Sequence, residues 1–151
     1  MATTLTAGNL VVKITESLTV NGKNYGNENT LTIATVKEPD LRIVTVPTSE
    51  KTLIAFGAAI GAGTYVESDV RYIRITNKDG TNFVTLNIEG DASTDFSVRL
   101  DPGASFLIIS SSATGVVDYA DISGATLEDL TAIKATADTA DVDVELFVVV
   151  V

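Results

Sequence analysis

The amino-acid sequence predicts an all-β protein: an antiparallel β-sandwich of the jelly-roll kind, with a small β-barrel as the second choice. Short runs rich in β-branched and aromatic residues follow one another, and turn residues separate them. No long stretch has the periodicity of an amphipathic helix. Because long helical crossovers are absent, parallel sheets are not expected. The chain contains no linker-like segment, so residues 1–151 are predicted to form one β-sandwich domain.

The first part of the chain carries five predicted strands bounded by turn residues. Asn21-Gly22 predicts a type I′ hairpin turn, because both residues tolerate positive φ. Pro47 ends a strand, because proline cannot donate to the hydrogen-bond ladder of a sheet. These strands cover residues 10–14, 18–20, 31–36, 41–46 and 51–56.

The second part continues the same pattern. The run 77–80 is expected to form a type I turn with Gly80 in the left-handed region. Pro102 and Gly103 predict a second tight turn, because proline presets φ and glycine accepts positive φ. Residues 106–109 read as a strand buried on both faces. The predicted strands of this part cover residues 70–75, 83–88, 96–100, 106–109 and 142–151.

One stretch, residues 121–130, has no clear assignment. Ser123 or Thr126 could cap a single helical turn over residues 127–130. A single turn of this kind would leave the all-β prediction unchanged.

The composition argues against several function classes. The chain has no histidine and no cysteine, so it lacks the commonest general base and thiolate chemistry. We therefore predict no enzyme activity, no catalytic residue, no cofactor and no metal site. The formal charge of −10 and the lack of a Lys/Arg cluster predict no binding to nucleic acid. The polar start predicts no signal peptide, and the longest apolar run, 146–151, is too short to span a membrane.

Two local patterns could suggest chemistry but have simpler explanations. Ser49 and Lys51 are the nearest serine–lysine pairing, yet that chemistry needs a buried lysine of lowered pKa beside the serine. Gly57, Gly61 and Gly63 could cradle a phosphate only with a helix behind them, and a strand is expected there instead. We interpret this glycine-rich segment as an apolar loop, which could also make a protein contact.

A calcium site is the alternative interpretation of Asp138, Asp141 and Asp143, since hard cations bind several carboxylate oxygens. Their spacing does not match the EF-hand loop. On an amphipathic strand, Asp141 and Asp143 would simply face solvent. The sequence leaves open whether these three residues bind a cation.

The end of the chain is the strongest sign of assembly. A strand that is apolar on both faces would aggregate at a free edge. It must therefore be central in its sheet or covered by another subunit. The predicted interface residues are Phe147, Val149 and Val151.

The order of the strand and turn motifs resembles that of small virion proteins of tailed bacteriophages, most of all capsid decoration (cement) proteins with a β-sandwich fold. The resemblance covers the chain from about residue 10 to 150, through strand-and-turn patterns of modest specificity. The segments that carry it are 12–16, 18–22, 29–33, 72–77, 82–86, 96–103, 133–137 and 142–145.

The resemblance implies a structural virion protein that binds and stabilises the phage capsid surface. Its expected partners are the major capsid protein or other virion proteins and further copies of itself, for example as a trimer. Its expected location is the virion, assembled in the host cytoplasm. The alternatives are a tail, neck or baseplate component, or a carbohydrate-binding receptor module.

Overall fold

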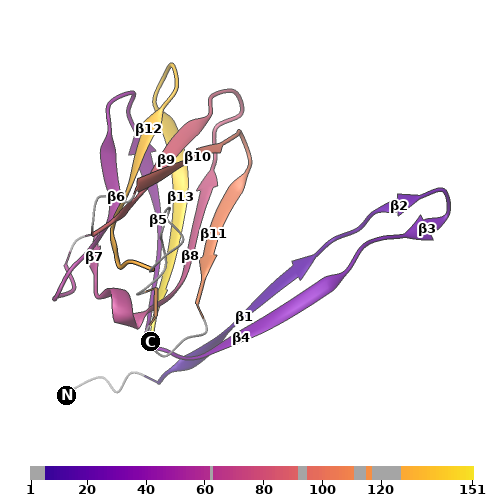
Figure 1. The fold of residues 1–151 in the computed structure, drawn as a ribbon, viewed down its shortest axis with the longest axis horizontal. Helices are drawn as coiled ribbons and strands as arrows, with labels where there is room; N and C mark the ends of the chain where they lie inside the picture. Colours follow the sequence, from indigo (N-terminus) through magenta and orange to yellow (C-terminus); the bar gives the residue numbers. More distant parts are fainter. Residues whose placement is uncertain (1–5, 62, 92–94, 111–114, 117–126) are drawn as a thin grey trace.

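Two β-sheets packed face to face and one long β-hairpin make up the chain in the computed structural model (Figure 1). The structure describes residues 6–61, 63–91, 95–110, 115–116 and 127–151. Outside strands, the regular element of these residues is a short 3-10 helix, η1 (Glu67–Asp69). The predicted all-β antiparallel sandwich is therefore confirmed.

One layer of the sandwich, which we call the five-stranded sheet, has the order β10-β9-β12-β6-β7. Its long neighbours pair antiparallel, and only the two-residue β7 runs parallel to β6. Its strands are β6 (Lys51–Phe56), β7 (Thr64–Tyr65), β9 (Val84–Gly90), β10 (Asp95–Leu100) and β12 (Leu130–Ala137).

The other layer, the four-stranded sheet, has the order β11-β8-β13-β5, and all of its pairings are antiparallel. The C-terminal strand lies between two neighbours. It is therefore central in its sheet, which is one of the two arrangements that its apolar sequence allows. The strands are β5 (Glu38–Val46), β8 (Val70–Asn77), β11 (Ser105–Ile109) and β13 (Val142–Val150).

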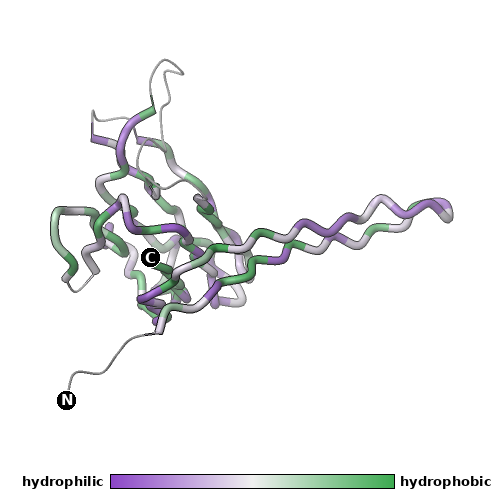
Figure 2. Tube along the Cα trace, turned by 90° about the horizontal axis from the view of Figure 1, so that it is seen from below, coloured by the Kyte–Doolittle hydropathy of each residue, from purple (hydrophilic) through white to green (hydrophobic). Residues whose placement is uncertain are grey.

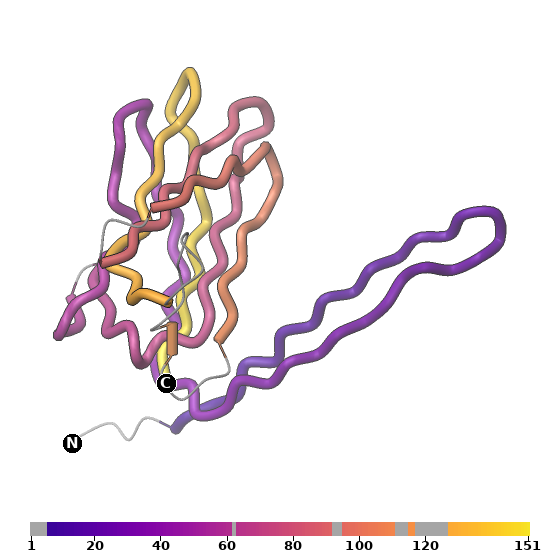
Figure 3. Tube along the Cα trace, in the orientation of Figure 1, coloured from indigo at the N-terminus to yellow at the C-terminus, as the bar shows by residue number. Residues whose placement is uncertain are grey.

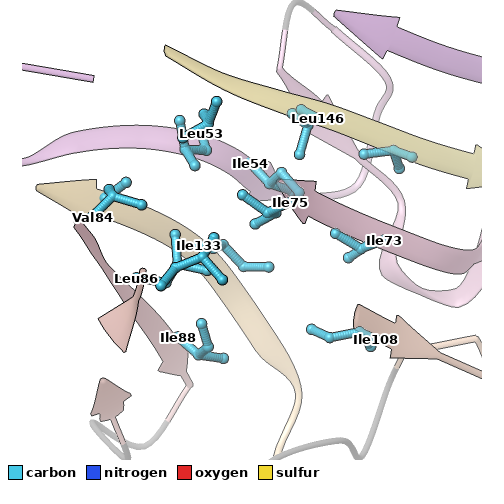
Figure 4. Close-up of a cluster of buried hydrophobic side chains, with 14 of the residues drawn as sticks. Leu53, Ile54, Ile73, Ile75, Val84, Leu86, Ile88, Ile108, Ile133 and Leu146 are labelled. Atoms are coloured by element: carbon cyan, nitrogen blue, oxygen red, sulfur yellow. The ribbon is translucent and has the colours of Figure 1, made fainter. Parts of the chain in front are cut away.

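Alternating apolar residues on both sheets fill the space between the layers (Figure 4). Successive side chains of a strand point to opposite faces, so β9 and β13 each bury one series of residues in this core. The members of the two series are fully or almost fully buried; they are Val84, Leu86, Ile88, Val142, Val144, Leu146, Val148 and Val150.

The N-terminal hairpin, which we call the arm, projects away from the sandwich (Figures 1 and 3). It consists of β1 (Gly8–Thr15) paired with β4 (Glu28–Val36), and of the short β2 (Thr19–Val20) and β3 (Lys23–Asn24) at its tip. Asn21 and Gly22 have φ values of 52° and 78°, as the predicted type I′ turn requires. The tight turn therefore lies at the far end of the arm.

An irregularity at the base of the arm accompanies its departure from the body. The β1–β4 register shifts between Gly8 and Leu10, and Thr35 has a φ of 60°. Positive φ is rare for a β-branched residue, and bulges of this kind bend a strand. Only Lys37 separates β4 from β5, and its N–H donates to the Val150 carbonyl at 3.0 Å. The arm is thus tied closely to the C-terminal strand.

Two sequence-based predictions need correction, and one possibility that the sequence left open is not realised. Gly80 does not have positive φ; the Asp79 carboxylate instead accepts from the N–H groups of Thr81 and Asn82, both at 2.6 Å, and so shapes the turn. The strand at 106–109 is not buried on both faces: Ile108 points into the core, whereas Leu107 lies on the outer face of the four-stranded sheet and is exposed. Residues 127–130 form no helical turn, and Leu130 begins β12; Ser123 and Thr126 lie outside the described residues.

Among the described residues, Asn77 at the end of β8 is the one polar residue that is fully buried. Its amide nitrogen donates to the carbonyls of Asn82 and Leu100 at 2.9 and 3.1 Å, and its side-chain oxygen accepts from the Asp79 N–H at 2.9 Å. A buried polar group is tolerated when its hydrogen bonds are satisfied. Asn77 therefore joins the β8–β9 turn to the end of β10.

We expect Asn77→Leu to lower the free energy of unfolding by about 3 kcal/mol, because it leaves buried backbone groups without partners. Chemical denaturation would measure the change. Asn82→Ala is the matched control, because it removes only the exposed contact with Thr139 and keeps the backbone carbonyl. Equal effects of the two substitutions would contradict this role of Asn77.

Gly103 confirms the second predicted turn. Its φ is 75°, Pro102 precedes it, and the Ala104 N–H donates to the Asp101 carbonyl at 3.0 Å. A Cβ at Gly103 would meet no atom within 4 Å, so a substitution there tests backbone conformation alone.

We expect Gly103→Val to cost about 1–3 kcal/mol of stability through backbone strain. Gly103→Asn should cost clearly less, because asparagine tolerates the left-handed region. Thermal unfolding of both variants would measure the difference. An unchanged melting temperature in Gly103→Val would show that the turn does not require positive φ.

Candidate interaction surface

On the sandwich, Lys134 and Arg74 form ion pairs with carboxylates of neighbouring strands, Glu89 and Glu145. Lys134 Nζ on β12 lies 2.7 Å from Glu89 and 3.3 Å from Glu50. Hydrogen bonds to these carboxylates raise the pKa of Lys134, and such a lysine stays protonated. This cluster is suited to tying strands together on the surface rather than to accepting a proton.

A second polar cluster lies where β5 meets β7. Tyr65 donates its hydroxyl proton to Asp40, and Arg42 Nη2 donates to the Leu53 carbonyl at 3.1 Å. Burial, with the hydrogen bond to Asp40, raises the pKa of the Tyr65 hydroxyl. The hydroxyl therefore stays protonated and acts as a hydrogen-bond donor between the two sheets.

The residues singled out from the sequence for chemistry form no reactive group with these clusters. Lys51 is exposed and donates to the Thr45 carbonyl at 2.8 Å, so it is not the buried lysine that serine–lysine chemistry requires. The segment from Gly57 to Gly63 leads into β7, as the apolar-loop interpretation predicted, and exposes Ile60.

The three aspartates of the calcium alternative are all exposed. Asp143 lies on β13 and accepts a hydrogen bond from Thr45 at 2.6 Å. Among the residues that the structure describes, no group of three or more His, Cys, Asp or Glu side chains is placed to hold a metal ion.

Apolar residues recur along one face of the arm, interrupted by polar residues such as the pair Glu16 and Asn27. Leu10 pairs with Ile33 and Val12 with Leu31, and every second residue of a strand shares a face. Toward the tip, Leu18 pairs with Tyr25 and Val20 with Lys23 in the same register. The apolar residues of this face, which we call the arm stripe, are Leu10, Val12, Ile14, Leu18, Val20, Tyr25, Leu31 and Ile33.

The near half of the arm stripe is buried against the arm's own body. Ile33 forms a small apolar cluster with Tyr72 and Val149 on the outer face of the four-stranded sheet, and Leu10, Val12 and Leu31 are among the residues packed around it. This cluster is separate from the core between the sheets. The arm base therefore covers the second apolar face of β13.

This packing places the three predicted interface residues. Val149 is 1% exposed beneath the arm base, whereas Phe147 and Val151 are half-buried at its margin. The Phe147 ring meets Tyr72 edge-on, with centroids 5.7 Å apart, and lies beneath Arg74. Cover from the same chain thus accounts for Val149, and the predicted subunit contact of Phe147 and Val151 stays a prediction.

The far half of the arm extends away from the described part of the sandwich (Figure 2). Ile14, Leu18, Val20 and Tyr25 are all exposed, Leu18 by 54% and Tyr25 by 57%. From Ile14 to Val20 the strand rises about 3.3 Å per residue, so the free part extends about 20 Å. A two-stranded hairpin by itself is at best marginally stable in water.

The outer faces of the two sheets differ in polarity. The five-stranded sheet presents polar side chains, among them Thr85, Asn87 and Lys134. On the four-stranded sheet, Leu41 and Ile43 of the edge strand β5 are 62% and 64% exposed, and Phe147 lies directly across from Leu41. Leu107 lies on the same outer face, but Arg74, which forms an ion pair with Glu145, separates it from Phe147.

A shallow hollow adjoins these residues at the arm base. It has a volume of about 190 Å³ and is lined by residues that include Leu10, Val36, Pro39, Phe147 and Val149. Adjoining exposed apolar side chains of this kind often mark a protein contact. We call Leu41, Ile43, Leu107 and Phe147 with this hollow the sheet patch.

Sequence reasoning identified Phe147 but missed Leu41, Ile43 and the far half of the arm stripe. The available signal was the Asn-Gly turn between two alternating strands, which predicts a hairpin. Alternation alone does not reveal whether a hairpin lies on a core or extends beyond it.

No protein-family model, no curated protein and no solved structure matches this chain. In the described part of the chain, no helix is long and apolar enough to cross a membrane.

The contact between the arm base and the body can be tested by a double-mutant cycle of Ile33→Ala and Val149→Ala. Because the two side chains belong to one cluster, we expect a coupling energy of at least about 0.5 kcal/mol in the free energy of unfolding. As a control, Val11→Ala changes the opposite face of the arm and should show no coupling with Val149→Ala. Additive effects of Ile33→Ala and Val149→Ala would contradict the packing of the arm base on β13.

Proposed function

We propose that this chain is a non-enzymatic structural protein of a phage particle, which binds and stabilises the capsid surface as a decoration or cement protein. The observation that carries this proposal is the arm, a projecting hairpin with exposed apolar residues. The sandwich from which it projects has a second exposed apolar surface, the sheet patch. Such surfaces suit binding to other proteins. Major capsid protein, other virion proteins and further copies of the chain are the proposed partners, and the virion is the proposed location.

The strand order gives the proposal a second line of support. Numbered from β5 and without the two-residue β7, the eight sandwich strands follow the orders 1-8-3-6 and 2-7-4-5. We infer that the sandwich is a jelly roll, an architecture of two sheets and eight strands used by many viral capsid proteins. A shared architecture supports a role only by analogy, since one fold serves many functions.

The charge distribution is suited to a component that meets a defined partner. The arm carries two lysines and two glutamates and is neutral, so the formal charge of −10 lies on the rest of the chain. Like charge keeps bodies apart in solution. On a lattice, many weak contacts through the arm would add up to firm attachment.

A tail, neck or baseplate component would use the same surfaces and differ in copy number. A carbohydrate-binding module is favoured less, because sugar binding uses exposed aromatic rings, and Tyr25 is the aromatic residue among the strongly exposed apolar side chains of the described part.

Mass spectrometry of purified particles of the virus that encodes this chain would test the proposed role. We expect hundreds of copies per particle, as capsid decoration requires. A dozen or fewer copies would support a tail or neck component instead. Absence from the particles would overturn the proposed virion role.

A further inference from the structure

Among the described residues, the chain's own body leaves the far half of the arm stripe uncovered. The arm base is fixed by the cluster around Ile33 and Val149 and by the hydrogen bond from Lys37 to Val150. From there the arm runs away from the sandwich in both views (Figures 1 and 2). Its own sheet patch is left open, since Leu41 and Ile43 remain exposed with the arm in place.

We propose that the far half of the arm binds the sheet patch of a second copy of this chain. The arm presents Ile14, Leu18, Val20 and Tyr25, and the patch presents Leu41, Ile43, Phe147 and Leu107 beside the hollow at the arm base. This inference rests on the assembly role proposed above, and it names the partner and the two surfaces that meet.

The near half of the same stripe already shows how such a contact is made. Leu10, Val12, Leu31 and Ile33 lie on the outer face of the four-stranded sheet, over Tyr72 and Val149. The sheet patch continues that same outer face, with Phe147 at the margin of the cluster. A second arm would therefore meet the face that already holds the first one, with side chains of the same chemical kind.

The charge distribution favours binding of a second arm to the sheet patch over contact between two sandwich domains. Two bodies that approach each other bring together the strong negative charge that lies outside the arm, whereas a neutral arm adds none. Lys23 lies on the stripe face near the tip, 5.0 Å from the centre of the Tyr25 ring. The receiving face exposes Asp143, so the charge near the tip is opposite to the charge at the border of the patch.

Two variants separate this contact from folding. Leu18→Ser with Val20→Ser changes the arm tip, and Leu41→Ser with Ile43→Ser changes the patch; all four residues are exposed, so the fold should survive. Val11→Ser is the control, because Val11 is also exposed, by 57%, and lies on the opposite face of the same arm. Sedimentation equilibrium should show that each double variant raises the dissociation constant of self-association at least about tenfold, while Val11→Ser leaves it unchanged.

Because the chain has no cysteine, disulfide trapping can locate the contact directly. Chains carrying Leu18→Cys are mixed with chains carrying Leu41→Cys or Ile43→Cys under mild oxidation. We expect cross-linked heterodimers in at least about tenfold higher yield than with Val11→Cys as the arm variant. Equal yields from Leu18→Cys and Val11→Cys would overturn the inference.

The same measurements distinguish this inference from the virion role. A protein that stays monomeric at about 0.1 mM, where a contact of even moderate affinity would form, overturns the arm–patch contact. Cross-linking of the arm in intact particles to a different virion protein, and not to a second copy, also overturns it. The virion role then still stands if the copy number per particle is high, and it fails separately if the chain is absent from particles.

Discussion

The second half of the strand β13 needs apolar cover on both of its faces, and much of the arrangement follows from that requirement. Its inner series from Val142 to Val150 fills the core between the sheets. On the other face Val149 has no second sheet above it, and the arm base supplies the cover through Ile33. An exposed apolar strand promotes aggregation. The central position of β13 in its sheet and the cover from the arm base both prevent this exposure.

With this arrangement, apolar surface stays exposed on the far half of the arm and on the sheet patch. The base of the arm covers Val149. The rest of the arm continues beyond the body and carries further apolar residues of the arm stripe. The body keeps Leu41 and Ile43 uncovered on the same outer face. Surfaces of this kind on a strongly acidic chain favour a specific contact with an apolar centre and a charged border. The proposed decoration role and the proposed arm–patch contact both depend on this pair of surfaces.

Much of the fold could be predicted from local signals. Asn21-Gly22 and Pro102-Gly103 set their turns because backbone conformation is decided by few residues, and 51–56 matches β6 residue for residue. The prediction that Gly80 has positive φ was wrong, because hydrogen bonds to the Asp79 carboxylate shape that turn instead. The arm could not be predicted, since the alternation at 10–14 and 31–36 is the same for a strand in a sandwich and for one that leaves it. Thr35, a β-branched residue with positive φ, gives no sequence signal for the bulge at the arm base.

Hydrogen exchange along the arm tests the central claim most directly, because it reads the two halves of one hairpin separately. In dilute protein, the account predicts that amides of Leu10, Val12, Leu31 and Ile33 exchange as slowly as those of the body, whereas amides from Glu16 to Asn27 exchange fast. The distal amides should gain protection as the protein concentration rises, and the basal ones should not change. Equal protection along the whole arm at every concentration would contradict the claim that the far half of the arm depends on a second surface.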